Sequence, residues 1–169
     1  ERFNPARFDP HAWVRLAKAA GQRYMVFTTK HHDGFSMFDT LFSNYKITKT
    51  PYKKDILAEL VAAAKAGNMP LGFYYSPIDA DHPAYRDTTK LTATNYAGEP
   101  ARPDWPLYLE YMELQLRELL PRYGDVFVLW FDGGDNRKFA GARFHALIRT
   151  LQPAVLINNR MGLVGDFVT

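Results

Sequence analysis

The most regular feature of the chain is the recurrence of apolar residues at helical spacing in four segments. The first segment follows Asp9 and Pro10, which suit the N-cap and the first turn of a helix, and it ends at Gly21. The second is bounded in the same way, by Asp55 and Gly67. The pattern predicts helices over residues 10–20, 56–66 and 106–121, and a fourth helix around residues 144–151 that ends before Pro153.

Short apolar runs alternate with these helices. They cover residues 24–29, 71–75, 126–130 and 154–157. Each run is continuous rather than alternating, which is typical of strands buried on both faces, as in a parallel sheet covered by helices. The sequence therefore predicts an α/β fold built from a βα repeat.

The spacing of the strands favours one parallel architecture over another. Four units occupy 169 residues, so eight would need roughly 340, which is within the usual range of (β/α)8 barrels. An open doubly wound sheet is the alternative, but no glycine-rich phosphate loop follows any of the predicted strands. We therefore expect residues 1–169 to form one partial TIM-barrel-type domain of roughly four βα units, about half of a (β/α)8 barrel.

Composition excludes several classes of protein. A chain with 47% hydrophobic and 23% charged residues is too apolar to be disordered, and no run reaches the ~18 apolar residues of a membrane span. The net charge is +3 and the basic residues are scattered, so we expect neither nucleic acid nor a membrane as partner. The absence of cysteine excludes disulfides, thiolate metal sites and cysteine nucleophiles.

Polar residues suited to chemistry follow each predicted strand. His31 and His32 come after the first strand, Ser76 after the second, Asp132 after the third and Arg160 after the fourth. The carboxyl ends of parallel strands form the face on which barrel enzymes place their catalytic residues. Polar side chains at all four strand ends therefore predict a functional site on that face.

Asp132 is the strongest candidate for chemistry in this set. It follows an aromatic and apolar strand and precedes two glycines, so its carboxylate would project into a pocket with room for a ligand. In sugar hydrolysis such a carboxylate attacks the anomeric carbon and forms a glycosyl-enzyme intermediate. The alternative is a structural aspartate that caps the turn or binds Arg160.

The adjacent His31 and His32 admit three interpretations. Neighbouring strand residues point to opposite faces, so a shared metal ion would require a bend in the backbone. No His-x-His or His-x-x-x-His spacing is present to favour a metal site. Hydrogen bonding of neutral imidazoles to a polyhydroxyl ligand fits the pattern better, and a structural role is the third interpretation.

Aromatic residues at two strand ends are less specific signals. Trp130 and the pair Tyr74-Tyr75 suit core positions as well as the walls of a ligand site. Side chains alternate along a strand, so one of the two tyrosines must face the barrel interior and the other must face the helices. The sequence alone does not decide which.

The segment 77–106 is a polar loop, longer than a connection requires, as is typical of functional loops. Within it, Asp79, Asp81 and His82 are either contacts at the rim of a site or solvated polar residues. Lys30, at the end of the first strand, could pair with a neighbouring carboxylate.

Two polar blocks are highly specific in combination: Lys-His-His-Asp-Gly-Phe at 30–35 and Trp-Phe-Asp-Gly at 130–133. Further motifs occur at 8–13, 19–24, 72–77, 123–125 and 158–166. As a set, in this order and spacing, they resemble the α-L-fucosidases of glycoside hydrolase family 29. The resemblance covers nearly the whole chain.

The resemblance implies a retaining exo-glycosidase that removes terminal α-L-fucose from a fucosylated glycan or small fucoside, without a metal ion or organic cofactor. By position, Asp132 matches the family's nucleophile. The residues that match its substrate-binding positions are His31, His32, Tyr75, Trp130 and Arg160. The family's acid/base carboxylate lies beyond the Arg160 region, outside this chain, so we expect residues 1–169 alone to be inactive.

The motifs leave alternatives open. A barrel glycosidase for another sugar, or a protein that binds fucose without cleaving it, could share them. The family usually has a His-Trp-Gly segment upstream of the point at which this chain begins, and often an Asp-Trp pair where this chain has Asp79 and Ala80. By analogy the chain holds barrel strands two to five, in a protein expected to be secreted or periplasmic.

Overall fold

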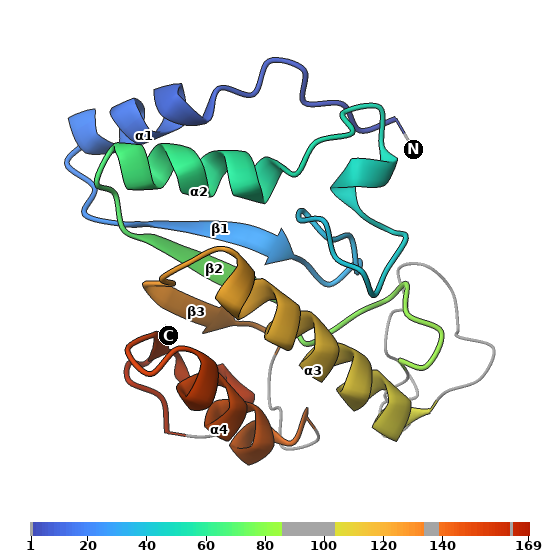
Figure 1. The fold of residues 1–169 in the computed structure, drawn as a ribbon. Helices are drawn as coiled ribbons and strands as arrows, with labels where there is room; N and C mark the ends of the chain where they lie inside the picture. The colour runs from blue at the N-terminus through green and yellow to red at the C-terminus, as the bar shows by residue number, and fades with distance from the viewer. Residues whose placement is uncertain (1, 86–103, 134–138, 163) are drawn as a thin grey trace.

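The computed structural model describes residues 2–85, 104–133, 139–162 and 164–169 (Figure 1). Within these residues the strands are β1 (Met25–Lys30), β2 (Leu71–Tyr75), β3 (Val128–Phe131) and β4 (Leu156–Ile157). The helices are α1 (Pro10–Ala19), α2 (Ile56–Ala66), α3 (Trp105–Arg122) and α4 (Gly141–Leu151), with short 3₁₀ helices η1 (Ile47–Lys49) and η3 (Asn159–Met161). In this part of the chain, no helix is long and apolar enough to cross a membrane.

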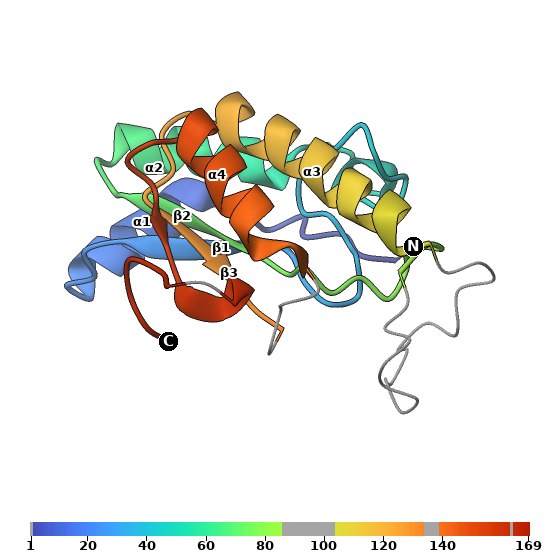
Figure 2. The ribbon, with the colours of Figure 1, turned by 90° about the horizontal axis from the view of Figure 1, so that it is seen from below.

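The strands form one parallel sheet in the order β1-β2-β3-β4. Each strand therefore lies next to the one before it in the chain, which is the order in a (β/α)8 barrel, whereas a doubly wound sheet reverses its direction of growth. Figure 2 shows α2, α3 and α4 on one side of the sheet. The predicted (β/α)8-type α/β fold is confirmed, and among the described residues β1 and β4 form the two edges of the sheet.

Side-chain caps explain where three of the helices begin. Asp9 caps α1 and Asp55 caps α2, and each accepts the backbone N–H three residues ahead, at 2.8 and 3.0 Å. Each bond satisfies a backbone donor that has no partner inside its helix. The third helix begins at Trp105, one residue before the predicted start, because Asp104 provides its cap.

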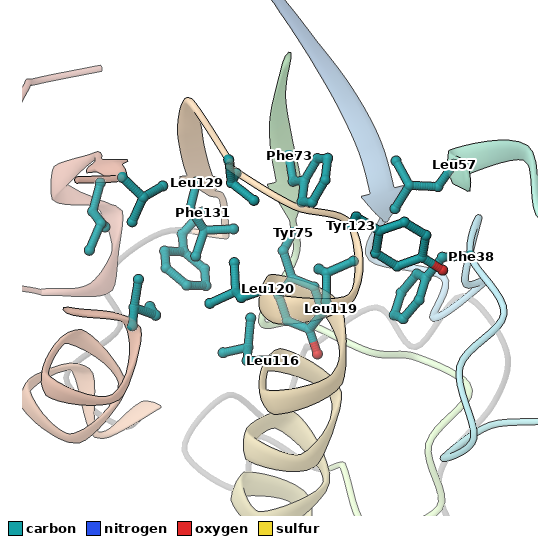
Figure 3. Packing of buried hydrophobic residues seen from close by; sticks show 14 of the residues in the cluster. Phe38, Leu57, Phe73, Tyr75, Leu116, Leu119, Leu120, Tyr123, Leu129 and Phe131 are labelled. Atoms are coloured by element: carbon teal, nitrogen blue, oxygen red, sulfur yellow. The ribbon is translucent and has the colours of Figure 1, made fainter. Parts of the chain in front are cut away.

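The main hydrophobic core lies between the sheet and the helices that cover it (Figure 3). Phe73 of β2 and Phe131 of β3 are at most 1% exposed and point into this layer. Burying side chains of this size contributes roughly 1.5–3 kcal/mol each. Other buried residues around them are Tyr75, Leu116, Leu119, Leu120 and Leu129.

The opposite face of the sheet is partly open. Tyr74 and Trp130, which alternate with the buried residues along their strands, are half-buried, and Thr28 and Leu156 are exposed. The expected burial of the strands on both faces therefore holds for the helix-facing side, while the described residues leave the second face uncovered. The polar strand ends collect on this open face.

Candidate active site

His31 and His32 lie together after β1 because the strand is irregular at its end. The pairing of β1 with β2 shifts by one residue between Thr28 and Lys30, and such a bulge re-aims the side chains that follow it. The two imidazole ring centroids are 4.3 Å apart, so the backbone supplies the bend that a straight strand lacks. Among the described residues, no His, Asp or Glu side chains form a group of three that could hold a metal ion.

His32 is fixed by the residue that follows β2. Its Nδ1 atom lies 2.5 Å from the hydroxyl oxygen of Ser76, and that hydroxyl donates to the carbonyl of Ile78 at 3.0 Å. Because a serine has a single proton to donate, His32 Nδ1 donates to Ser76 in this arrangement. The Nε2 atom of the neutral ring is then a hydrogen-bond acceptor, which suits a ligand hydroxyl.

Tyr74 connects the histidines to Asp132. Its ring stacks on His31 with centroids 5.4 Å apart and an interplanar angle of 6°, and its hydroxyl donates to Asp132 Oδ2 at 3.0 Å. Burial, together with the hydrogen bond to Asp132, raises the pKa of Tyr74 well above its ordinary value. The hydroxyl therefore stays protonated near neutral pH and remains a donor to the carboxylate.

Asp132 receives hydrogen bonds on both carboxylate oxygens. Oδ2 accepts from Tyr74, and Oδ1 accepts the N–H of Gly133 at 2.8 Å. The guanidinium of Arg160, from η3, lies 3.8 Å from Oδ1. The structural contacts that formed the alternative interpretation are thus present, and they leave the side chain 36% exposed on the open face, available to a ligand.

The expected ligand contact of Tyr75 requires correction. Tyr75 is 0% exposed, points toward α3 in Figure 3, and donates its hydroxyl to Gln115 at 2.8 Å. A side chain on the helix-facing side of the sheet cannot touch a ligand on the open side. The neighbouring Tyr74 points to the open side instead, and Trp130, its register partner on β3, lies on the same face.

Asp79 is neither a rim contact nor a solvated residue, so both expectations for it are wrong. It is 1% exposed, and its Oδ2 lies 2.9 Å from Nζ of Lys30, which is 0% exposed. Lys30 thus pairs with a nearby carboxylate, as its position allowed. Asp81 is exposed and His82 is half-buried, while residues 86–103 of the predicted loop lie outside the described part of the chain.

An apolar cavity of about 650 Å³ adjoins His31 along the edge of β1, where Val26, Phe27 and Thr28 line it. Its wall includes Phe35 and Tyr45, whose rings meet edge to face with centroids 5.0 Å apart. Asp132 does not line this cavity. Of the two residues, His31 therefore borders the cavity and Asp132 lies outside it.

His32 is expected to titrate below pH 6.5. Burial, followed by repulsion from His31, lowers its pKa from that ordinary value. The folded protein then binds this proton less tightly than the unfolded chain, so stability falls as the pH decreases from 6.5 toward the folded-state pKa. A histidine-selective NMR titration measures the midpoint, and a midpoint at or above 6.5 would contradict the described environment of His32.

The sequential parallel sheet, with its site at the carboxyl ends of the strands, defines a protein of the (β/α)8-barrel class. A family model described as α-L-fucosidase matches residues 1–166, so the chain belongs to the α-L-fucosidase family. The family resemblance expected from the motifs is therefore confirmed.

Individual relatives agree with this assignment. Putative α-L-fucosidase 1 of Oryza sativa subsp. japonica is 36% identical over 167 residues, which cover 95% of this chain and 29% of the relative. The structure of α-L-fucosidase isoenzyme 1 from Paenibacillus thiaminolyticus is 40% identical with a TM-score of 0.88, over 98% of this chain and 44% of that chain. A family 29 α-L-fucosidase from Bacteroides thetaiotaomicron, trapped as a covalent intermediate with 2-fluoro-fucosyl fluoride, is 33% identical with a TM-score of 0.84, over 98% of this chain and 40% of that one. The chain spans less than half the length of these relatives.

Proposed function

We propose that this protein is a retaining exo-α-L-fucosidase and that residues 1–169 form part of its catalytic barrel domain. The observation that supports this most is the carboxylate of Asp132 at the end of a barrel strand, which accepts a hydrogen bond from Tyr74 and lies close to the guanidinium of Arg160. The chain that carries it belongs to the α-L-fucosidase family. The trapped intermediate of the Bacteroides relative supports a double displacement in this family.

In the first step of the proposed reaction, a carboxylate oxygen of Asp132 attacks the anomeric carbon of fucose as the glycosidic bond breaks. A carboxylic acid outside residues 1–169 protonates the departing oxygen, so that a fucosyl ester of Asp132 forms and the aglycone leaves as an alcohol. In the second step, water attacks the same carbon, the conjugate base takes the proton from water, and the ester bond breaks. Fucose is released with its configuration retained.

The other residues on the open face bind and orient the sugar. Tyr74 and Arg160 hold the carboxylate of Asp132 in place for attack. Neutral His32 accepts a hydrogen bond from a fucose hydroxyl at Nε2. The ring of His31, whose centroid is 4.3 Å from that of His32 and which stacks on Tyr74, binds a neighbouring hydroxyl. Trp130 gives the apolar wall that the methyl group of a 6-deoxy sugar requires. The scheme uses neither a metal ion nor an organic cofactor.

Turnover of an aryl α-L-fucoside by the full-length protein tests the proposal, with an aryl β-D-galactoside as the control sugar. We expect hydrolysis of the fucoside, and labelling of Asp132 by a 2-fluorinated fucosyl fluoride, detected by peptide mass spectrometry. Hydrolysis of the galactoside in preference would indicate another sugar specificity. Binding of L-fucose with neither turnover nor labelling would indicate a fucose-binding protein without catalysis.

Tyr74→Phe is expected to lower kcat/KM for the aryl fucoside about 10- to 100-fold, because a hydrogen bond to a charged group contributes ~1.5–3 kcal/mol. Tyr75→Phe is the matched control, since it removes the adjacent hydroxyl, which bonds Gln115 in the core. Its melting temperature is expected to fall while kcat/KM stays within about twofold of wild type. Equal losses of activity in the two variants would contradict the assignment of Tyr74, rather than Tyr75, to the site.

A further inference from the structure

Lys30 and Asp79 form a buried ion pair that the proposed reaction does not use. Lys30 is the last residue of β1, Asp79 lies in the segment after β2, and their charged atoms are 2.9 Å apart. The rings of Tyr75, Tyr108 and Tyr111 surround the ammonium group, with centroids 4.7, 5.9 and 5.6 Å from Nζ. The pair is therefore enclosed by aromatic carbon rather than by water.

Stability is a weak explanation for such a pair. Removing two charges from water costs several kcal/mol per ion, and well-packed apolar residues in the same place are often as stabilising or more so. The cost is visible in Lys30, because burial lowers its pKa against the opposing attraction of Asp79. A charge-assisted bond does, however, fix the distance and direction between the two segments that carry it.

The same carboxylate also organises the segment after β2. Asp79 Oδ1 accepts the backbone N–H groups two and three residues ahead, at 3.1 and 2.9 Å. The N–H of Ala80, next to Asp79, donates to the carbonyl of His32 at 2.9 Å. The segment that follows β1 and the segment that follows β2 are thus joined through both the backbone and the ion pair.

Gly34 shows how closely these two segments approach. Its φ is +83°, and a Cβ atom at this position would lie 2.2 Å from Asp79 Oδ1. A side chain of any size would therefore push Asp79 away from segment 31–34. With the segments after β1 and β2 this close together, His32 contacts Ser76, with 2.5 Å between its Nδ1 atom and the hydroxyl oxygen.

We propose that the Lys30–Asp79 pair is a positioning element that sets the place of His32 and, through it, the fit of the fucose hydroxyls; the part concerning fucose rests on the proposed function. Lys30 precedes His32 by two residues and Asp79 follows Ser76 by three, so the pair anchors both ends of the His32–Ser76 contact. Without the pair the two segments shift relative to each other, and a misplacement of about 1 Å is enough to weaken a precisely built site.

The double variant Lys30→Met/Asp79→Asn separates positioning from stability. It removes both charges and nearly keeps the volume, so the melting temperature of the full-length protein is expected to stay close to wild type. The KM of the aryl fucoside and the Kd of L-fucose are expected to rise about tenfold. This is the lower end of the loss that follows when residues orienting the metal-binding side chains of a metal site are removed. Wild-type KM and Kd in this variant would show that the pair is merely structural and would overturn the proposal.

Two further variants keep the test decisive. Asp79→Asn alone retains the volume and the Oδ1 acceptor but leaves Lys30 buried without its counter-ion, so we expect the same rise in KM together with a lower melting temperature. Tyr123→Phe is the matched control for lost stability, because it removes a hydroxyl bonded to Asp55 at 2.5 Å, away from both segments. It is expected to lower the melting temperature with KM unchanged, and a rise in its KM equal to that of Asp79→Asn would count against positioning.

A crystal structure of the double variant distinguishes this proposal from the proposed function. Displacement of His32 from Ser76 supports the positioning role even if the wild-type protein neither binds L-fucose nor hydrolyses fucosides. An unmoved His32 with its contact to Ser76 intact would overturn the positioning role, whatever the activity.

Discussion

Asp132→Asn is expected to reduce turnover of an aryl α-L-fucoside by about 10⁴-fold or more, which corresponds to ~5.4 kcal/mol of activation free energy. The amide has nearly the shape of the carboxylate, so the contacts with Tyr74 and Gly133, and with them the fold, are largely kept. A neutral amide oxygen, however, is a poor nucleophile and cannot form the fucosyl ester. Steady-state kinetics and thermal melting of the full-length variant measure both effects, and wild-type-like rates would exclude Asp132 as the nucleophile.

Asp132→Ala gives a second readout that a structural aspartate would not produce. Removing the carboxylate opens space in which azide can attack the anomeric carbon, with the aryl alcohol as leaving group. We expect added azide to restore part of the turnover and to yield β-L-fucosyl azide, identified by NMR. Asp125→Ala, at an exposed aspartate before β3, is the matched control and is expected to keep the wild-type rate with no response to azide.

The boundaries of the helices that carry a side-chain cap could be predicted because their signals are local, whereas α4 has no such cap and begins at Gly141, ahead of the predicted Phe144. Asp9 and Asp55 each bond a backbone N–H within their own first turn, so a few residues of sequence carry the information. Strand length is different, because it depends on a partner. The sequence predicts a strand over residues 154–157, but β4 contains Leu156 and Ile157 alone, because its ladder with β3 holds two pairs, opposite Val128 and Leu129.

The placement of the candidate residues on one face was predictable where a strand end specifies it. His31, His32, Trp130, Asp132 and Arg160 all lie on the open face, because parallel strands bring their carboxyl ends to one edge. The choice between the two tyrosines at the end of β2 was not predictable, because it depends on which face of the strand packs against α3. Gln115, the partner of Tyr75 on α3, is 40 residues away in the chain. The pairing of Lys30 with Asp79 spans 49 residues, and its burial follows from the bulge at the end of β1, for which the sequence has no local signal.

Phe73→Ala is expected to lower the free energy of unfolding by ~3–5 kcal/mol. Phe73 is 1% exposed at the centre of β2, and its ring meets that of Tyr123 edge to face with centroids 6.3 Å apart (Figure 3). Deleting the ring removes its transfer free energy and leaves a cavity between sheet and helices that the packed neighbours cannot fully close. Denaturant unfolding of the full-length protein measures the loss.

Phe42→Ala is the matched control for this core substitution, because Phe42 is 39% exposed and the same atoms are removed. Its free energy of unfolding is expected to change by less than ~1 kcal/mol. Since Phe73 faces the helices while Tyr74 faces the ligand side of the same strand, Phe73→Ala is expected to lower the folded fraction while leaving kcat/KM per folded molecule close to wild type. Equal losses of stability at the two phenylalanines, or a collapse of kcat/KM in the folded Phe73→Ala protein, would contradict the separation of core and site across β2.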